Sequence, residues 1–107
     1  MNNMYAVTPE PPYYAVIFSS IQTNNTLGYN ETAERMLEFA AKQPGFLGVE
    51  SARETLGITV SYWKNLESIR RWKENSEHII AQKKGKQQWY KSFKTRIAKV
   101  ERDYEMM

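Results

Sequence analysis

The only side chain in this sequence that titrates near neutral pH without help from its surroundings is His78. It stands six residues after Trp72, in a segment where Leu66, Ile69 and Trp72 recur at helical spacing. A histidine beside an aromatic pocket can act as a general base or as an axial ligand, so His78 is the candidate catalytic residue. The alternative is a histidine near the start of a helix, next to Glu77, that packs at the rim of a cavity or is simply solvated.

Two tryptophans are candidates for contact with a ligand. Trp72 continues the apolar stripe of the same helical segment, so its spacing favours a place in the core or in a pocket wall over a part in chemistry. Trp63 ends a strand directly after Tyr62, and alternation along a strand sends the two rings to opposite faces of a sheet. One ring should face the helices, and the other should face a second subunit.

A third aromatic group, formed by Trp89, Tyr90 and Phe93, lies in the basic half of the chain. Residues 61–107 carry twelve Lys or Arg against six Asp or Glu. Basic residues interleaved with aromatic ones are typical of single-stranded nucleic-acid binding. However, Trp89 and Phe93 are four residues apart, which is core spacing on a helix whose outer face is coated with lysines. We therefore favour packing over nucleic acid, and the charge offers a way to attract an anionic substrate.

Composition excludes several kinds of site. Without cysteine and with one histidine, the chain has no disulfide, thiolate zinc site or iron–sulfur cluster, and no multi-histidine metal site within one chain. No apolar run approaches the roughly 20 residues that span a bilayer, and the first residues lack the pattern of a signal peptide. We expect one cytoplasmic domain that does not associate with membranes.

Apolar periodicity and turn signals predict the elements that position these residues. Residues 1–12 contain three prolines and are expected to form an extended arm before a single domain at residues 13–107. The predicted elements are a strand at Tyr13–Gln22, a helix at Tyr29–Lys42, strands at Phe46–Arg53 and Ile58–Trp63, a helix from Leu66, and a strand at Thr95–Tyr104. We expect Gly45 and Gly48 to serve a turn and a bulge, and Gly57 to adopt positive φ in the hairpin turn.

The second helix is expected to start after an Asn65 cap and to break at Asn75-Ser76. Ser76 would then cap a second piece, His78–Lys84, ended by Gly85, and a further helical turn would run from Lys86 to Phe93. The position of this break would decide where His78 points.

The order strand, helix, two strands, helix, strand predicts an α+β fold of the ferredoxin-like, split βαβ type. Its four-stranded antiparallel sheet carries both helices on one face. The first strand is apolar on both phases, and the chain is too short to supply another layer. A second copy is the simplest cover, so we expect a homodimer through the sheet faces.

Three stretches give the chain a family resemblance: Tyr13–Phe18, the junction Gln43–Ser51, and Ile58–Trp63 with Trp72 and His78. Together they resemble the antibiotic biosynthesis monooxygenase (ABM) domain, and within it the small YqjZ-type members, from Tyr13 to Tyr104. The resemblance implies a dimeric α+β barrel and a monooxygenase acting on an aromatic or otherwise hydrophobic small molecule, with no cofactor expected. His78 would then be the base. Substrate-binding residues would be Trp72, Trp63, Phe18 and Arg71, the last as charge partner.

Other relatives of this family degrade haem, in the manner of IsdG. They resemble this chain at Trp72, but they carry a haem-ligating histidine at the position of Gln82 and an asparagine in the first strand, where this chain has Phe18, Ser19 or Ser20. These differences argue against haem degradation of that type. Two alternatives stay open: a protein that binds haem or another small ligand in the same cavity, and a module that serves only for interaction.

Overall fold

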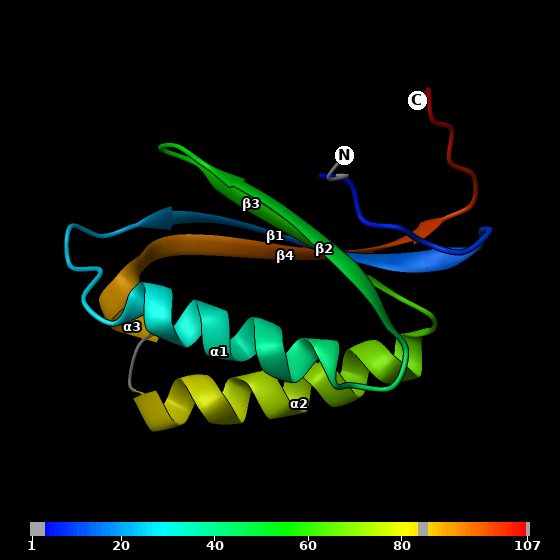
Figure 1. Ribbon diagram of the computed structural model, residues 1–107. Coiled ribbons are helices and arrows are strands. Elements are labelled where there is room, and N and C mark those ends of the chain that lie inside the picture. Colours follow the sequence, from blue (N-terminus) through cyan, green and yellow to red (C-terminus); the bar gives the residue numbers. More distant parts are fainter. Residues whose placement is uncertain (1–3, 84–85, 107) are drawn as a thin grey trace.

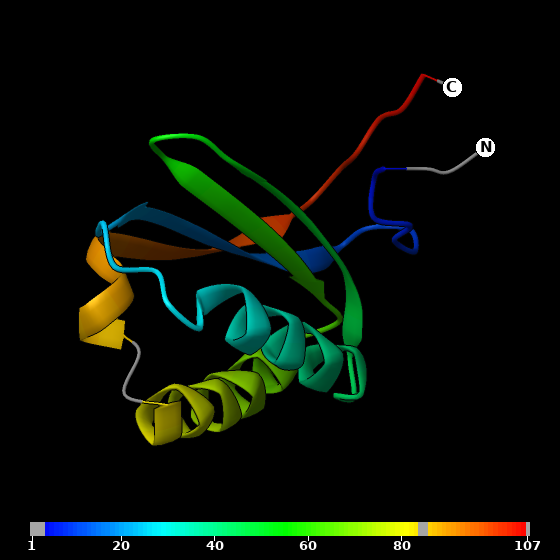
Figure 2. The same ribbon diagram turned by 60° about the vertical axis from the view of Figure 1, so that its left-hand side comes forward.

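Four strands form one sheet, and two long helices cover one of its faces (Figures 1 and 2). The structure is a computed structural model that describes the backbone of residues 4–83 and 86–106 and the side chains of residues 4–77 and 88–106. Its elements are β1 (Tyr13–Gln22), α1 (Tyr29–Ala41), β2 (Phe46–Arg53), β3 (Gly57–Trp63), α2 (Leu66–Lys83), α3 (Lys86–Trp89) and β4 (Tyr90–Val100). The strand order β2-β3-β1-β4, with every pair antiparallel, confirms the predicted ferredoxin-like fold.

Glycines shape the β2–β3 hairpin for two different reasons. Gly45 precedes β2 with a φ of 87°, and the register shifts between Phe46 and Gly48, so the predicted turn and bulge are confirmed. The prediction for Gly57 is wrong, because its φ is not positive. The Arg53 guanidinium lies where a Gly57 side chain would be. Gly57 therefore provides space rather than an unusual backbone conformation.

Helix α2 starts as predicted but does not break where we expected. The Asn65 side-chain oxygen accepts a hydrogen bond from the Ser68 N–H at 2.8 Å, which confirms the cap. The helix then continues through Asn75 and Ser76 to Lys83. The Asn75 side chain donates to the Gln43 side chain, just after α1, and the Ser76 hydroxyl donates to the carbonyl of Lys73 within α2. The two polar residues are thus used inside an unbroken helix.

The C-terminal segment also differs from the prediction. A helical turn was expected as far as Phe93, whereas α3 ends at Trp89 and β4 begins at Tyr90. β4 pairs with the whole of β1, from Tyr13 opposite Val100 to Gln22 opposite Tyr90. This long-range pairing, which local spacing does not reveal, extends the strand at its start. The predicted stop at Gly85 lies outside the described residues.

The core lies between the sheet and the helices. Trp63 is completely buried and packs with Ala40 of α1 and Ile69 of α2. The rings of Tyr14, Phe46 and Trp72 and the side chain of Val16 surround this centre. Tyr62 points to the opposite face, where its ring meets Tyr13 edge-on at 5.8 Å. The predicted separation of Tyr62 and Trp63 is confirmed.

The described parts of the N-terminal arm and the C-terminal tail lie on the side of the sheet away from the helices (Figures 1 and 2). Residues 4–12 have no helix or strand, but the Ala6 N–H donates to Glu50 at 2.9 Å and Tyr62 donates to the same carboxylate at 2.7 Å. Tyr13 accepts from Thr8 and donates to Asp103. These contacts cover one end of that face. None of the helices in the described part of the chain has the length and apolarity needed to cross a membrane.

Candidate active site

Aromatic side chains on the helix-facing side of the sheet form two groups. The first, which we call the inner cluster, consists of Trp63, Trp72 and Phe46. Trp72 stacks on Trp63 with ring centroids 6.1 Å apart and planes 24° apart, and Phe46 meets Trp63 edge-on at 5.3 Å. The Trp63 indole N–H donates to the Ser61 hydroxyl at 2.9 Å. Trp63 is therefore a fully satisfied core residue, while Trp72 and Phe46 are only partly buried.

The second group, the outer cluster, gathers at the start of β4. Its members are Phe18, Tyr29, Trp89, Tyr90 and Phe93. Phe18 lies 5.5 Å from Tyr90 and 5.4 Å from Phe93, and Tyr29 meets Trp89 and Tyr90 edge-on. Phe18 thus belongs here and not with Trp63 and Trp72. Trp89 and Phe93 do pack, as we favoured, but from a helix and a strand rather than from one helix.

Trp89 also fixes the loop before α1. Its indole N–H donates to the carbonyl of Leu27 at 2.9 Å, and its own carbonyl accepts from the Thr23 N–H at 2.7 Å. Thr23 donates its hydroxyl to the carbonyl of Gln88. These bonds hold the start of α1, and with it Tyr29, against α3 and the outer cluster.

A cation lies beside the outer cluster. Arg53, at the end of β2, donates one N–H to the carbonyl of Ser20 at 3.3 Å and another to the Ser20 hydroxyl. Ser20 is only 1% exposed, and register places it opposite Gly57 in β3 and Phe93 in β4. The guanidinium is therefore held over Gly57, on the same side of the sheet as the aromatic rings.

The Tyr90 hydroxyl has a strongly altered acidity. Burial is the main cause that raises the pKa of Tyr90 above its usual range, and a hydrogen bond with Tyr29 adds to it. The nearby Arg53 cation acts in the opposite direction. The Tyr90 hydroxyl is thus a neutral group close to a fixed positive charge at one end of the outer cluster.

Arg71, the predicted charge partner, is not brought to either cluster. Its side chain is 59% exposed on α2, and its guanidinium bonds to Glu67 at 3.3 Å. Glu67 also pairs with Arg70, which lowers the pKa of that carboxyl. The structure therefore places Arg71 in an exposed network of charges along one side of the helix.

The side chains of His78 and Gln82 lie outside the described part of the structure, although their backbone belongs to α2. On an unbroken helix, position 78 follows position 71 by about two turns. The break that was expected to decide where His78 points is absent. Its role as base or ligand remains a prediction for mutagenesis. Within the side chains that the structure describes, no three His, Asp or Glu residues gather as metal ligands.

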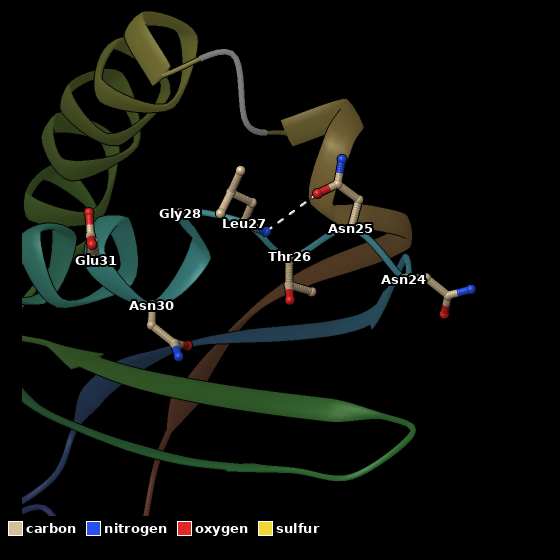
Figure 3. Close-up of a pocket in the computed structure, with 7 residues that line it drawn as sticks. All are labelled: Asn24, Asn25, Thr26, Leu27, Gly28, Asn30 and Glu31. Atoms are coloured by element: carbon tan, nitrogen blue, oxygen red, sulfur yellow. Dashed lines mark hydrogen bonds between the residues drawn. The ribbon is translucent and has the colours of Figure 1, made fainter.

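A hollow of about 530 Å³ opens at the loop before α1 (Figure 3). It is lined by Asn24, Asn25, Thr26, Leu27, Gly28, Asn30 and Glu31. The Asn25 side chain accepts from the Leu27 N–H at 3.4 Å, so part of this polar lining stabilises the loop itself. The lining contains amides, one hydroxyl and one carboxylate but no aromatic ring, and it does not offer the apolar surface that an aromatic ligand needs.

Sequence reasoning missed Arg53, Ser20 and Tyr29. One signal was available: Arg53 is the only basic residue between Lys42 and Lys64. A single arginine in a hairpin that is otherwise free of basic residues is a candidate for binding a carboxylate or another anion. Nothing in the local pattern, however, pairs Arg53 with Ser20, which is 33 residues away.

Comparison with known proteins gives the chain its family. The family model described as antibiotic biosynthesis monooxygenase matches residues 12–84. The uncharacterized protein YqjZ of Bacillus subtilis (strain 168) is 56% identical over 104 residues, which cover 95% of this chain and 91% of YqjZ.

Solved structures share the fold at low sequence identity. SnoaB from Streptomyces nogalater, described as a cofactor-independent oxygenase, matches with a TM-score of 0.65 at 12% identity and covers 90% of this chain and 98% of its own. PA3566 from Pseudomonas aeruginosa matches with a TM-score of 0.67 at 13% identity, over 90% and 99% of the two chains. Because the family model matches most of the sequence and a relative at 56% identity spans nearly all of it, the chain belongs to the antibiotic biosynthesis monooxygenase (ABM) family.

Proposed function

We propose that this protein is a monooxygenase that acts on a hydrophobic, aromatic small molecule without a cofactor. The observation that carries the proposal is the pair of aromatic clusters on the helix-facing side of the sheet, in which Trp72 and Phe18 are only partly buried. We assign these two rings as the walls that contact the ligand. Flat rings offer apolar area and favourable stacking to an aromatic substrate. Family membership, and a fold shared with a cofactor-independent oxygenase, support the reaction class.

Such a reaction needs a substrate that is itself easily oxidised. A base removes a proton from an activated CH₂ group, and the resulting carbanion gives one electron to O₂. The two radicals combine into a peroxide, which loses water and leaves a carbonyl, so that CH₂ and O₂ become C=O and H₂O. The protein has to supply a base, an apolar surface and donors for the developing oxyanion. His78 is the base in this proposal, because it is the only side chain that titrates near neutral pH unaided.

The test uses anthrone, a tricyclic aromatic ketone with an acidic CH₂ group, as probe. Purified protein should accelerate O₂ uptake and insert one oxygen atom from ¹⁸O₂ into the product without added metal, flavin or haem. His78→Ala should lower the rate by about 10²- to 10⁴-fold with the fold intact by circular dichroism. The matched control is Glu77→Gln, an exposed neighbour on α2. Oxygen uptake no faster than in buffer, for anthrone and its hydroxylated analogues, would overturn the proposal.

Haem binding is tested in the same preparation. If the protein is a haem or small-ligand binder, haemin should give a Soret shift that His78→Ala abolishes. Such a shift, together with no oxygen uptake in the presence of anthrone, would support haem binding as the function and overturn the proposal of a cofactor-free oxygenase.

The working form in this proposal is a homodimer through the open sheet face. Ile17 of β1 and Val60 of β3 are directly paired on that face, and Ile21 and Ile58, farther along the same two central strands, are exposed. Hydrogen bonds join the described parts of the arm and of the C-terminal tail to the end of this face near Tyr13. The remaining apolar surface has the character of a homodimer interface.

A further inference from the structure

Arg53 is held more firmly than an ordinary surface arginine. Two of its N–H groups bond to the buried Ser20, and the absence of a side chain at Gly57 lets the guanidinium lie directly on β3. A guanidinium that is already ordered loses little conformational entropy when it binds a further group. The cation is therefore pre-organised on the helix-facing side of the sheet.

This cation also keeps capacity for another partner. A guanidinium has five N–H donors, and the bonds to Ser20 use two of them. Among the ion pairs formed between described side chains, none involves Arg53; all three belong to Arg70 and Arg71 on α2. A positive charge held in place without a carboxylate is an arrangement suited to an anionic ligand.

The neighbours of Arg53 define what kind of anion would fit. Tyr90 lies close enough for the Arg53 charge to affect its ionisation, and the Tyr90 ring contacts Phe18 and Phe93. Phe93 is 43% exposed, so part of this aromatic surface is open to a ligand. A flat ring placed against Phe18 and Phe93 would direct a substituent toward Arg53 and toward the Tyr90 and Tyr29 hydroxyls.

We propose that Arg53 binds the ionised oxygen of a hydroxylated aromatic ligand whose ring contacts the outer cluster. The ligand class is thus a phenol or enol that binds as its anion, with Arg53 as a binding and positioning residue. The inference rests on the proposed function and narrows its substrate to aromatics that carry an acidic hydroxyl. Charge-assisted hydrogen bonds from a guanidinium favour the ionised form of such a group, and an anionic ring gives up an electron more easily than a neutral one.

The test measures binding alone, under argon, so that it does not depend on turnover. The probes are 1-naphthol and its methyl ether, 1-methoxynaphthalene, which share the ring but differ in the ability to ionise. Arg53→Gln should weaken 1-naphthol binding by about 10- to 100-fold and change binding of the methyl ether by no more than about twofold. Arg53→Lys should retain part of the preference, because it keeps the charge but loses the fork of donors.

A second variant changes the position of the cation without removing it. Gly57→Ala places a methyl group where the guanidinium lies and should weaken 1-naphthol binding in the same direction. Arg71→Gln, which removes an exposed cation paired with Glu67, is the matched control and should bind both probes normally. Thermal unfolding of each variant identifies any loss of fold.

Three results would overturn the inference: equal weakening of both probes in Arg53→Gln, no preference of the wild-type protein for 1-naphthol, or binding of neither probe. A different result separates the two proposals: the protein binds 1-naphthol more tightly than the methyl ether, this preference depends on Arg53, and no oxygen is consumed. That result would support the inference and overturn only the oxygenase proposal. The two failures are therefore distinguishable.

Discussion

Hydroxyl groups of three tyrosines are held in hydrogen bonds that the ionised form would lose. Burial is the first cause that raises the pKa of Tyr62, and its bond to the Glu50 carboxylate is the second. Burial is also the main cause that raises the pKa values of Tyr13 and Tyr90. The Tyr13 hydroxyl donates to Asp103. A group whose pKa is higher in the folded state stabilises the fold below its unfolded pKa, near 10, and this contribution is lost as the pH rises above that value.

The first prediction therefore concerns alkaline stability. The free energy of unfolding should fall above about pH 10, because the unfolded chain releases protons that the folded chain retains. Tyr62→Phe should make this fall less steep by removing one such group. Urea denaturation followed by circular dichroism, from about pH 8 to about pH 12, gives the slope. Tyr104→Phe, at an exposed position in the tail, is the control, and an unchanged slope in Tyr62→Phe would contradict the argument.

At the scale of elements, two turns with left-handed glycines set the ends of α1. Gly28 caps its start with a φ of 81°, and Gly45 follows its end with a φ of 87°. The surroundings of the two glycines differ. A Cβ on Gly45 would collide with Ser68 in the first turn of α2, whereas a Cβ on Gly28 would meet only Trp89 at an ordinary 3.8 Å. The turn before β2 is thus also a packing contact between the hairpin and α2.

This contrast predicts unequal effects of one substitution. Gly28→Ala should cost about 1–2 kcal/mol of unfolding free energy, the usual cost of positive φ in a residue with a side chain. Gly45→Ala should cost clearly more, because Ser68 has to move as well. The comparison needs only urea denaturation at neutral pH, with Gly28→Ala as the internal reference. Equal losses would show that the contact with Ser68 relaxes freely.

At the scale of the whole molecule, the two faces of the sheet have different partners. The helix-facing side carries the inner and outer clusters. The other side carries paired apolar residues on the face that α1 and α2 do not cover (Figures 1 and 2), and hydrogen bonds join the described parts of the arm and the tail to the end of that face near Tyr13. Burying such a face is worth roughly 25 cal/mol for each Å² of apolar surface removed from water. A second copy is the occupant that we propose.

The prediction at this scale is an oligomeric state that depends on the open face. Light scattering after gel filtration should give the mass of two chains for the wild-type protein and of one chain for Val60→Lys, because a charge buried without a partner opposes association. Ile17→Lys, at the position opposite Val60, should also give the mass of one chain. Leu37→Lys, an exposed change on α1, should leave the dimer intact. A wild-type protein with the mass of one chain would exclude the proposed interface.

Local patterns in the sequence determined most of the fold. Dense aromatic and β-branched residues identified β1, strand-like runs around a turn identified the hairpin, and the side chain of Asn65 marked the start of α2. These signals depend on residues only a few positions apart. They also placed Tyr62 and Trp63 on opposite faces. They determined less of the site: local patterns named Trp63 and Trp72 and the family resemblance added Phe18, but neither said which of the three side chains would meet.

Only the tertiary structure decided the arrangement around the outer cluster. Pairing with β1 extends β4 back to Tyr90. Helix α2 continues through Asn75 and Ser76, although Ser76 is a good local N-cap residue. Strand register alone brought Arg53 over Gly57 and against Ser20. Register depends on hydrogen bonds between distant segments, so no pattern within a short stretch of sequence contains it. The sequence determined which side chains face the helices, and the register decided which of them share a site.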